Sequence, residues 1–194
     1  MIAIDQIKNL RQETGVSVSE CKKALEQAKG DNEKAKEILR KWGKELAGKK
    51  SAREASIGII EAYVHPNMRI GAMVELRCET DFVAKSKDFK DLAHELCLQI
   101  TALNPVFLKE EDIDEKSLNE EKKIYQEQVK DSGKPKKIID QIIEGKLKKY
   151  KEQVSLLSQP WIKDDSKTIK NLIEEYVAKI GENIVIKRFE RFEI

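Results

Sequence analysis

The sequence predicts an α+β protein in which helices outweigh strands. Apolar residues recur at helical spacing over most of the 194 residues. Three shorter segments, at 57–64, 70–76 and 184–192, instead have the β-branched or alternating pattern of strands. Because a turn signal alone separates the first two, we expect a small antiparallel sheet packed with helices. A three-helix module precedes it, and a helical hairpin protrudes from it.

Residues 1–50 predict the module of three short helices. Gly15 follows the first helix, and Ser17–Glu20 forms a capping box that begins the second. Gly30 supplies a left-handed residue after the second helix. The third helix has a single apolar stripe at i, i+3, i+4 and i+7, made of Ala35, Ile38, Leu39 and Trp42.

The polar segment Lys44–Glu54, which contains glycine and several lysines, predicts a linker after the module. The expected domains, in chain order, are the module at 1–50, a linker at 51–56, the first part of the core sheet and helix at 57–113, a helical hairpin at 114–158, and a core helix with the last strand at 159–194.

The core begins with a predicted hairpin and a helix. The β-branched segment Ile57–Val64 and the alternating segment Ile70–Leu76 are joined by the turn His65-Pro66-Asn67. Thr80 can cap a short helical turn after the second strand. A longer helix follows, with an apolar face made of Phe89, Leu92, Ala93, Leu96 and Ile100.

The end of the chain predicts a helix and a strand that complete the sheet. An apolar stripe runs from Ile169 to Ile180, and Gly181 ends the helix. In the strand 184–192, alternation places Ile186 on one face and Phe189 on the other.

The hairpin at 114–158 has two arms. Ile124, Tyr125 and Val129 mark the first arm, and Gly133-Lys134-Pro135 turns the chain into the second. Arms of this length bury only their facing stripe. Two interpretations therefore stay open, a structural antiparallel pair and an association surface.

Composition argues against several function classes. Lys+Arg is 37 and Asp+Glu is 35, so the net charge of +2 does not favour binding to a phosphate backbone. No apolar run approaches the ~18 residues of a spanning helix, and no secretory signal is recognisable, so we expect no membrane association. The cysteines Cys21, Cys78 and Cys97 are odd in number and widely spaced, which favours a reducing cytoplasm.

The sequence contains no catalytic or metal-binding pattern. His65 and His94 have no Cys, Asp or Glu at ligand spacing. Gly43–Lys50 matches the start of a P-loop, but Lys50 stands where Ser or Thr should bind Mg²⁺, and a helix precedes it instead of a strand. We therefore predict a binding protein, not an enzyme, with no cofactor and no metal.

One pentapeptide, Thr80-Asp81-Phe82-Val83-Ala84, stands between a strand and a helix. In one interpretation, Phe82 and Val83 fasten the start of the helix to the core. In the other, Phe82 is an aromatic displayed on a rigid corner for a partner. The residues alone leave both open.

Two stretches resemble the signatures of one family, elongation factor Ts. Leu10–Gly15, followed by Cys21–Leu25 and Gly30-Asp31, resembles its N-terminal signature. Glu75–Lys85 resembles its second signature. Two independent signatures at suitable spacing are more specific than either alone, and the resemblance continues to Arg191-Phe192-Glu193 at the end of the chain.

The resemblance implies a guanine-nucleotide exchange factor that binds GDP-bound elongation factor Tu. The N-terminal module would resemble a ubiquitin-associated domain and dock on the partner's nucleotide-binding domain, and the matching residues are Arg11, Thr14, Gly15, Lys22 and Lys23. The corner Thr80, Asp81, Phe82 and Val83 would dislocate the partner's Mg²⁺. Phe82 would wedge between partner helices, and Asp81 would be the polar member at the helix start.

Two departures from the family's pattern are visible. Arg77 stands where Asn or a small residue is expected, on the strand just before the corner. The chain also has one core half, whereas longer relatives have two. It therefore resembles the short members that restore the second half as a homodimer and form a 2:2 complex with the partner. The segment Ile169–Phe192 is the candidate interface.

The alternative function is an RNA- or ribosome-associated module that uses Lys-rich helices, such as those with Lys22-Lys23 and Lys148-Lys149. The near-neutral charge and the 6% aromatic content argue against it, because RNA recognition uses basic surfaces and stacking platforms. A steep salt dependence of RNA binding would support it.

Overall fold

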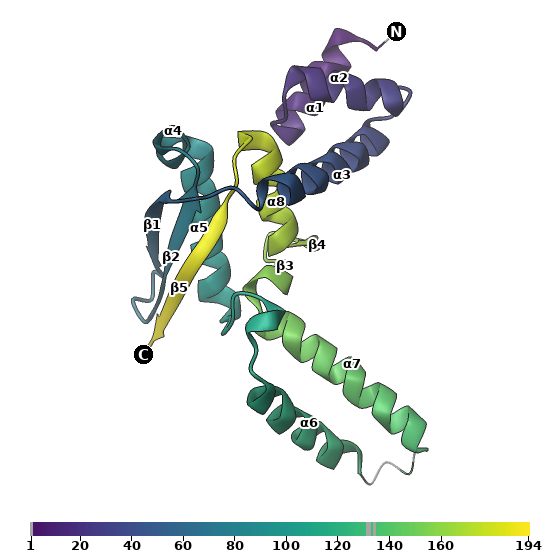
Figure 1. Ribbon diagram of the computed structural model, residues 1–194, viewed down its shortest axis with the longest axis vertical. Coiled ribbons are helices and arrows are strands. Elements are labelled where there is room, and N and C mark those ends of the chain that lie inside the picture. The colour runs from purple at the N-terminus through teal and green to yellow at the C-terminus, as the bar shows by residue number, and fades with distance from the viewer. Residues whose placement is uncertain (1, 131–132, 134) are drawn as a thin grey trace.

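A computed structural model describes residues 2–130, 133 and 135–194 of the chain (Figure 1). In chain order its elements are α1 (Ile4–Thr14), α2 (Val18–Gln27), α3 (Asn32–Lys50), β1 (Ile57–Val64), β2 (Ile70–Cys78), α4 (Asp81–Lys85), α5 (Lys87–Leu103), η1 (Glu110–Asp112), α6 (Glu115–Val129), α7 (Lys136–Val154), η2 (Leu156–Ser158), β3 (Pro160–Trp161), β4 (Asp164–Thr168), α8 (Ile169–Ile180) and β5 (Val185–Glu193).

The α+β prediction is confirmed. The strands β1, β2 and β5 form an antiparallel sheet in that order, so the C-terminal strand pairs with the second strand and not with the first. Helix α5 packs against β1 and β2, and α8 packs against α5 (Figure 1). The three N-terminal helices are present, and a second, two-stranded sheet made of β3 and β4 was not predicted.

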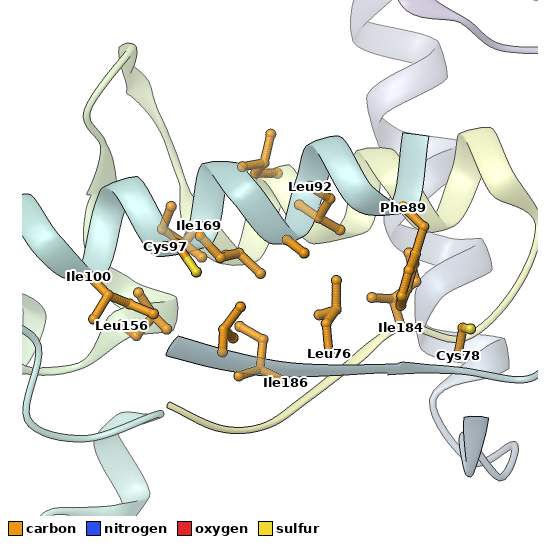
Figure 2. Packing of buried hydrophobic residues seen from close by; sticks show 14 of the residues in the cluster. Leu76, Cys78, Phe89, Leu92, Cys97, Ile100, Leu156, Ile169, Ile184 and Ile186 are labelled. Carbon is orange, nitrogen blue, oxygen red and sulfur yellow. The ribbon is translucent and has the colours of Figure 1, made fainter. Parts of the chain in front are cut away.

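The main core lies between α5 and the sheet (Figure 2). Side chains of β2 and β5, including Leu76 and Ile186, point toward Phe89 and Leu92 of α5. Both Cys78 and Cys97 are in this core, and Cys97 is buried deeply enough that desolvation raises the pKa of its thiol to about 12. The module has its own cluster around Leu10, Cys21, Ala24, Leu25 and Ala35.

The face predicted for Phe189 is wrong. A β-bulge interrupts the pairing of β2 with β5, because Leu76 pairs with Ile186 whereas Glu75 pairs with Arg188. One residue of β5 is thus unpaired, and the alternation of faces shifts by one position after it. Phe189 therefore pairs with buried Val74 and packs against the main core, on the same side as Ile186.

The linker predicted from Lys44 is also wrong over its first part, because α3 continues to Lys50. Packing explains the extension: α3 crosses α8, and Gly43 is buried against Ala178 and the backbone of Glu174 at the crossing. Ala47 packs against the main core, and the Lys50 ammonium donates to the Gly181 carbonyl. The module is therefore joined to the core through a helix. That residues 51–56 are the linker between the module and the core stays a prediction.

Helices α6 and α7 form an antiparallel pair that protrudes from the core (Figure 1). Val129 and Ile143 are its buried apolar residues. The predicted turn includes Lys134, which lies outside the described residues. A buried amide pair anchors the base of the hairpin: Gln99 of α5 donates to Gln159 at 3.1 Å, and Gln159 donates to the Gln153 carbonyl of α7 at 2.6 Å.

Across the portion of the chain that the structure describes, no helix is both long and apolar enough to span a bilayer.

Candidate partner-binding corner

The corner lies where strand β2 gives way to α5. The strand ends at Cys78, and the one-turn helix α4 begins three residues later at Asp81. Thr80 caps α4 as predicted, since its hydroxyl accepts the N–H of Val83 at 3.4 Å. Ser86 then ends α4 and caps α5 by accepting the N–H of Phe89. Two caps in succession fix the direction of the chain on both sides of Phe82.

Phe82 points away from the protein, with 82% of its surface exposed. Its neighbours do the opposite, because Val83 packs against the main core and Ala84 is buried. The interpretation that both residues fasten the helix start is therefore correct for Val83 and wrong for Phe82. Leaving a Phe exposed forgoes about 1.5–3 kcal/mol of burial, so Phe82 adds little to the stability of its own chain.

Asp81 is paired within the corner. Its carboxylate accepts a hydrogen bond from the Lys85 ammonium at 2.7 Å, one turn later on α4. This hydrogen bond and the positive charge of Lys85 hold the pKa of Asp81 below its ordinary value. The corner thus presents an aromatic ring beside an exposed pair of opposite charges.

Two residues that sequence reasoning missed hold the corner from behind. The carboxylate of Glu182 accepts hydrogen bonds from the backbone of Glu79 and Thr80 and from the Thr80 hydroxyl, at 2.7–3.1 Å. The backbone N–H of Asn183 donates to the Glu79 carboxylate at 2.7 Å. This hydrogen bond lowers the pKa of Glu79. No sequence pattern indicates these contacts, because more than 100 residues separate the partners.

The N-terminal candidates fall into two groups. Arg11, Thr14 and Gly15 lie together at the end of α1, where Gly15 has φ +69° and donates to the Arg11 carbonyl at 2.8 Å. Lys22 and Lys23 are exposed on α2. A side chain at position 15 would clash with Lys179 of α8, so this end of α1 also contacts the core.

The structure does not bring the N-terminal residues and the corner into one site. Figure 1 shows α4 and the α1–α2 pair on separate parts of the molecule, with α8 between them. If both groups bind a partner, they contact separate regions of it.

Arg77, the departure noted beside the corner, does not reach it. Its guanidinium pairs with Glu75 at 2.5 Å, and Glu75 also accepts from Arg188 of β5 at 2.8 Å. These two hydrogen bonds lower the pKa of Glu75, with Arg77 the larger cause. The three charges lie on the face of the sheet opposite to the core, so Arg77 belongs to a different surface from Phe82.

Among the residues with described positions, no group of three or more His, Cys, Asp or Glu side chains is arranged to hold a metal ion.

Comparisons with known proteins identify the family. The family model described as "Elongation factor TS" matches residues 4–177. The chain is 52% identical over 193 residues to an "Elongation factor Ts" of Thermotoga petrophila, with 100% of this chain and 96% of the relative covered. It is 49% identical over 193 residues to one of Coprothermobacter proteolyticus, of which 98% is covered. Full-length matches at this identity show that the chain belongs to the elongation factor Ts family of translation elongation factors.

Proposed function

We propose that the chain is the guanine-nucleotide exchange factor for elongation factor Tu and acts in the cytoplasm. The observation that carries this proposal is Phe82, exposed on a corner whose backbone is fixed by two helix caps and by Glu182. In this role Phe82 wedges between helices of GDP-bound elongation factor Tu and disturbs its Mg²⁺ and phosphate contacts. Thr80 and Val83 hold the ring in place, and Asp81 supplies the polar contact at the helix start.

Exchange of this kind breaks no covalent bond in either protein. It requires a ternary complex in which the factor and the nucleotide weaken each other's binding. Because this coupling is reciprocal, a factor that speeds GDP release is itself released by the incoming nucleotide. A rigid corner suits this task because little free energy is lost in ordering its residues on binding, so more of the binding free energy can displace the partner's helices.

The N-terminal module supplies the second contact in this proposal. Exposed Arg11, Lys22 and Lys23 are placed to pair with acidic residues of the partner's nucleotide-binding domain. Thr14 and Gly15 shape the end of α1 through their bonds to the Leu10 and Arg11 carbonyls. Helix α3 packs on α8 and so holds this contact at a fixed place relative to the corner.

Stopped-flow release of a fluorescent GDP from elongation factor Tu tests the exchange function. We expect the wild-type chain to accelerate release in a manner that saturates with its concentration. An unchanged release rate at micromolar concentrations of the folded chain would contradict the proposal.

We also propose that two copies of the chain assemble, giving a 2:2 complex with elongation factor Tu. In the described part of the chain, helices cover one face of the three-stranded sheet, and the other face is open (Figure 1). The open face carries exposed apolar residues and charges of both signs, as a surface that pairs with itself requires. These residues are Ile60, Val64, Met73 and Phe192, with Glu75, Arg77, Arg188 and Glu190.

We propose a smaller interface than the expected segment Ile169–Phe192, because only part of that segment is free of packing within its own chain. Helix α8 packs against α3 and α5 of its own chain, and Ile169, Leu172 and Val177 are buried there. Strand β5 is an edge strand and contributes to the open face. We therefore assign the interface to β5 and its neighbouring strands.

Replacing Ile60 by Glu should convert the assembly to single chains. Ile60 is 62% exposed, so the substitution should leave the fold intact while placing a charge in an apolar interface. Light scattering after size-exclusion chromatography should give the wild type twice the mass of one chain and the variant the mass of one. Val106→Glu, which changes another exposed apolar residue in a loop, should stay paired. A wild type with the mass of a single chain would contradict the assembly.

A further inference from the structure

Glu182 lies in the turn between α8 and β5, directly after Gly181, which ends α8 in a left-handed conformation. One carboxylate oxygen accepts the N–H groups of Glu79 at 3.1 Å and Thr80 at 3.0 Å. The other oxygen accepts the Thr80 hydroxyl at 2.7 Å. A single side chain therefore takes three hydrogen bonds from two consecutive residues at the base of the corner.

These hydrogen bonds satisfy N–H groups that have no partner in a strand or a helix. Glu79 and Thr80 follow the end of β2 and precede the first turn of α4, so their N–H groups have no place in a ladder or a helix. The Thr80 hydroxyl donates its proton to Glu182 and thereby keeps its lone pairs for the N–H of Val83. Glu182 thus supports the cap as well as the backbone that leads to it.

The corner and the turn after α8 contact each other through a second set of hydrogen bonds. The carboxylate of Glu79 accepts the backbone N–H of Asn183 at 2.7 Å, and the Asn183 amide donates to the Arg53 carbonyl at 2.8 Å. Lys50, the last residue of α3, donates to the Gly181 carbonyl. The turn after α8 therefore holds the corner, the segment before β1 and the end of α3 together.

We infer that Glu182 is a positioning residue for nucleotide exchange, which holds the Phe82 corner in its active direction without touching the partner. This inference rests on the proposed exchange function. Helix α4 has five residues, too few to be stable by itself. Its direction therefore depends on the packing of Val83 and Ala84 and on what fixes Thr80. Without Glu182, the N-terminal side of the corner should move more freely and Phe82 should hold its active direction less often.

The test measures GDP release from elongation factor Tu over a range of factor concentrations, which separates the maximum rate from the half-saturating concentration. Glu182→Ala should lower the maximum rate by about tenfold to a hundredfold, because small misplacements of an acting group have effects of that size. The half-saturating concentration should change much less, since the other contacts with the partner remain. Glu182→Gln should keep most of the rate, because its amide oxygen can still accept both N–H groups. Glu111→Ala, at an exposed carboxylate on η1, is the control.

The outcomes are distinguishable. A wild type without exchange activity would contradict the proposed function itself. A folded Glu182→Ala variant with the wild-type maximum rate would overturn the positioning role, as would a Glu182→Gln variant as slow as Glu182→Ala. Circular dichroism checks the fold. If the Ala variant does not fold, Glu182→Asp decides, because it keeps the charge but withdraws the carboxylate by one methylene. A lowered maximum rate then supports the role, and an unchanged rate overturns it.

Discussion

Phe82→Ala is expected to fold normally and to lose most exchange activity. Truncating an aromatic at the centre of an interface typically costs 2 kcal/mol or more, which is roughly thirtyfold in a rate or an affinity. The ring is 82% exposed in the free chain, so its removal should change the free energy of unfolding by no more than about 0.5 kcal/mol. Stopped-flow release of fluorescent GDP and thermal denaturation, on the same preparations, measure the two effects.

Two other results for Phe82→Ala would contradict this expectation. If the ring were a core residue, the variant would lose several kcal/mol of stability. An active and stable Phe82→Ala variant would instead remove the wedge while leaving the family assignment unchanged. Thr80 and Glu182 would then require another explanation.

Phe89→Ala should have the opposite effect to Phe82→Ala, with a large loss of stability and little change in exchange activity. Phe89 is fully buried between α5 and the sheet, beside Ile184 and close to Leu76 (Figure 2). Replacing a buried Phe by Ala removes transfer free energy and leaves a cavity, which costs about 3–5 kcal/mol. For a chain of this length, the midpoint of thermal unfolding should fall by roughly 10 °C.

The exchange rate should follow the folded fraction of Phe89→Ala. At a temperature where the variant is folded, we expect release of GDP near the wild-type rate, because Phe89 is covered by its own chain. A variant that unfolds at the wild-type midpoint would show that the core tolerates the cavity. That result would contradict the packing in Figure 2. The two phenylalanines lie seven positions apart, so the pair separates a binding role from a packing role.

Local sequence patterns predicted the elements because their causes are local. The stripe Ala35, Ile38, Leu39 and Trp42 and the caps at Ser17 and Thr80 depend on residues within a few positions of one another. The two signatures identified the family for the same reason, since each is a short continuous run. Fold class, family and the order of the larger elements were therefore accessible from the sequence.

Where prediction failed, a distant packing partner decided the outcome. The segment after Lys44 is polar and favours a linker, but Ala47 packs against the main core and Lys50 donates to the Gly181 carbonyl, so α3 continues over it. Phe189 changes face because β2 holds β5 across a bulge, and alternation along β5 alone does not reveal an unpaired residue.

By itself, the sequence determined the fold class, most of the helices, the three strands of the main sheet, and the position of the segment Thr80-Asp81-Phe82-Val83 between a strand and a helix. Only the tertiary structure decided that Phe82 points outward while Val83 points inward, because neighbouring residues of a short helix receive their directions from what each one packs against. Only the tertiary structure brought Glu182 to Thr80, since that contact joins residues 102 positions apart and depends on the sheet that pairs β2 with β5.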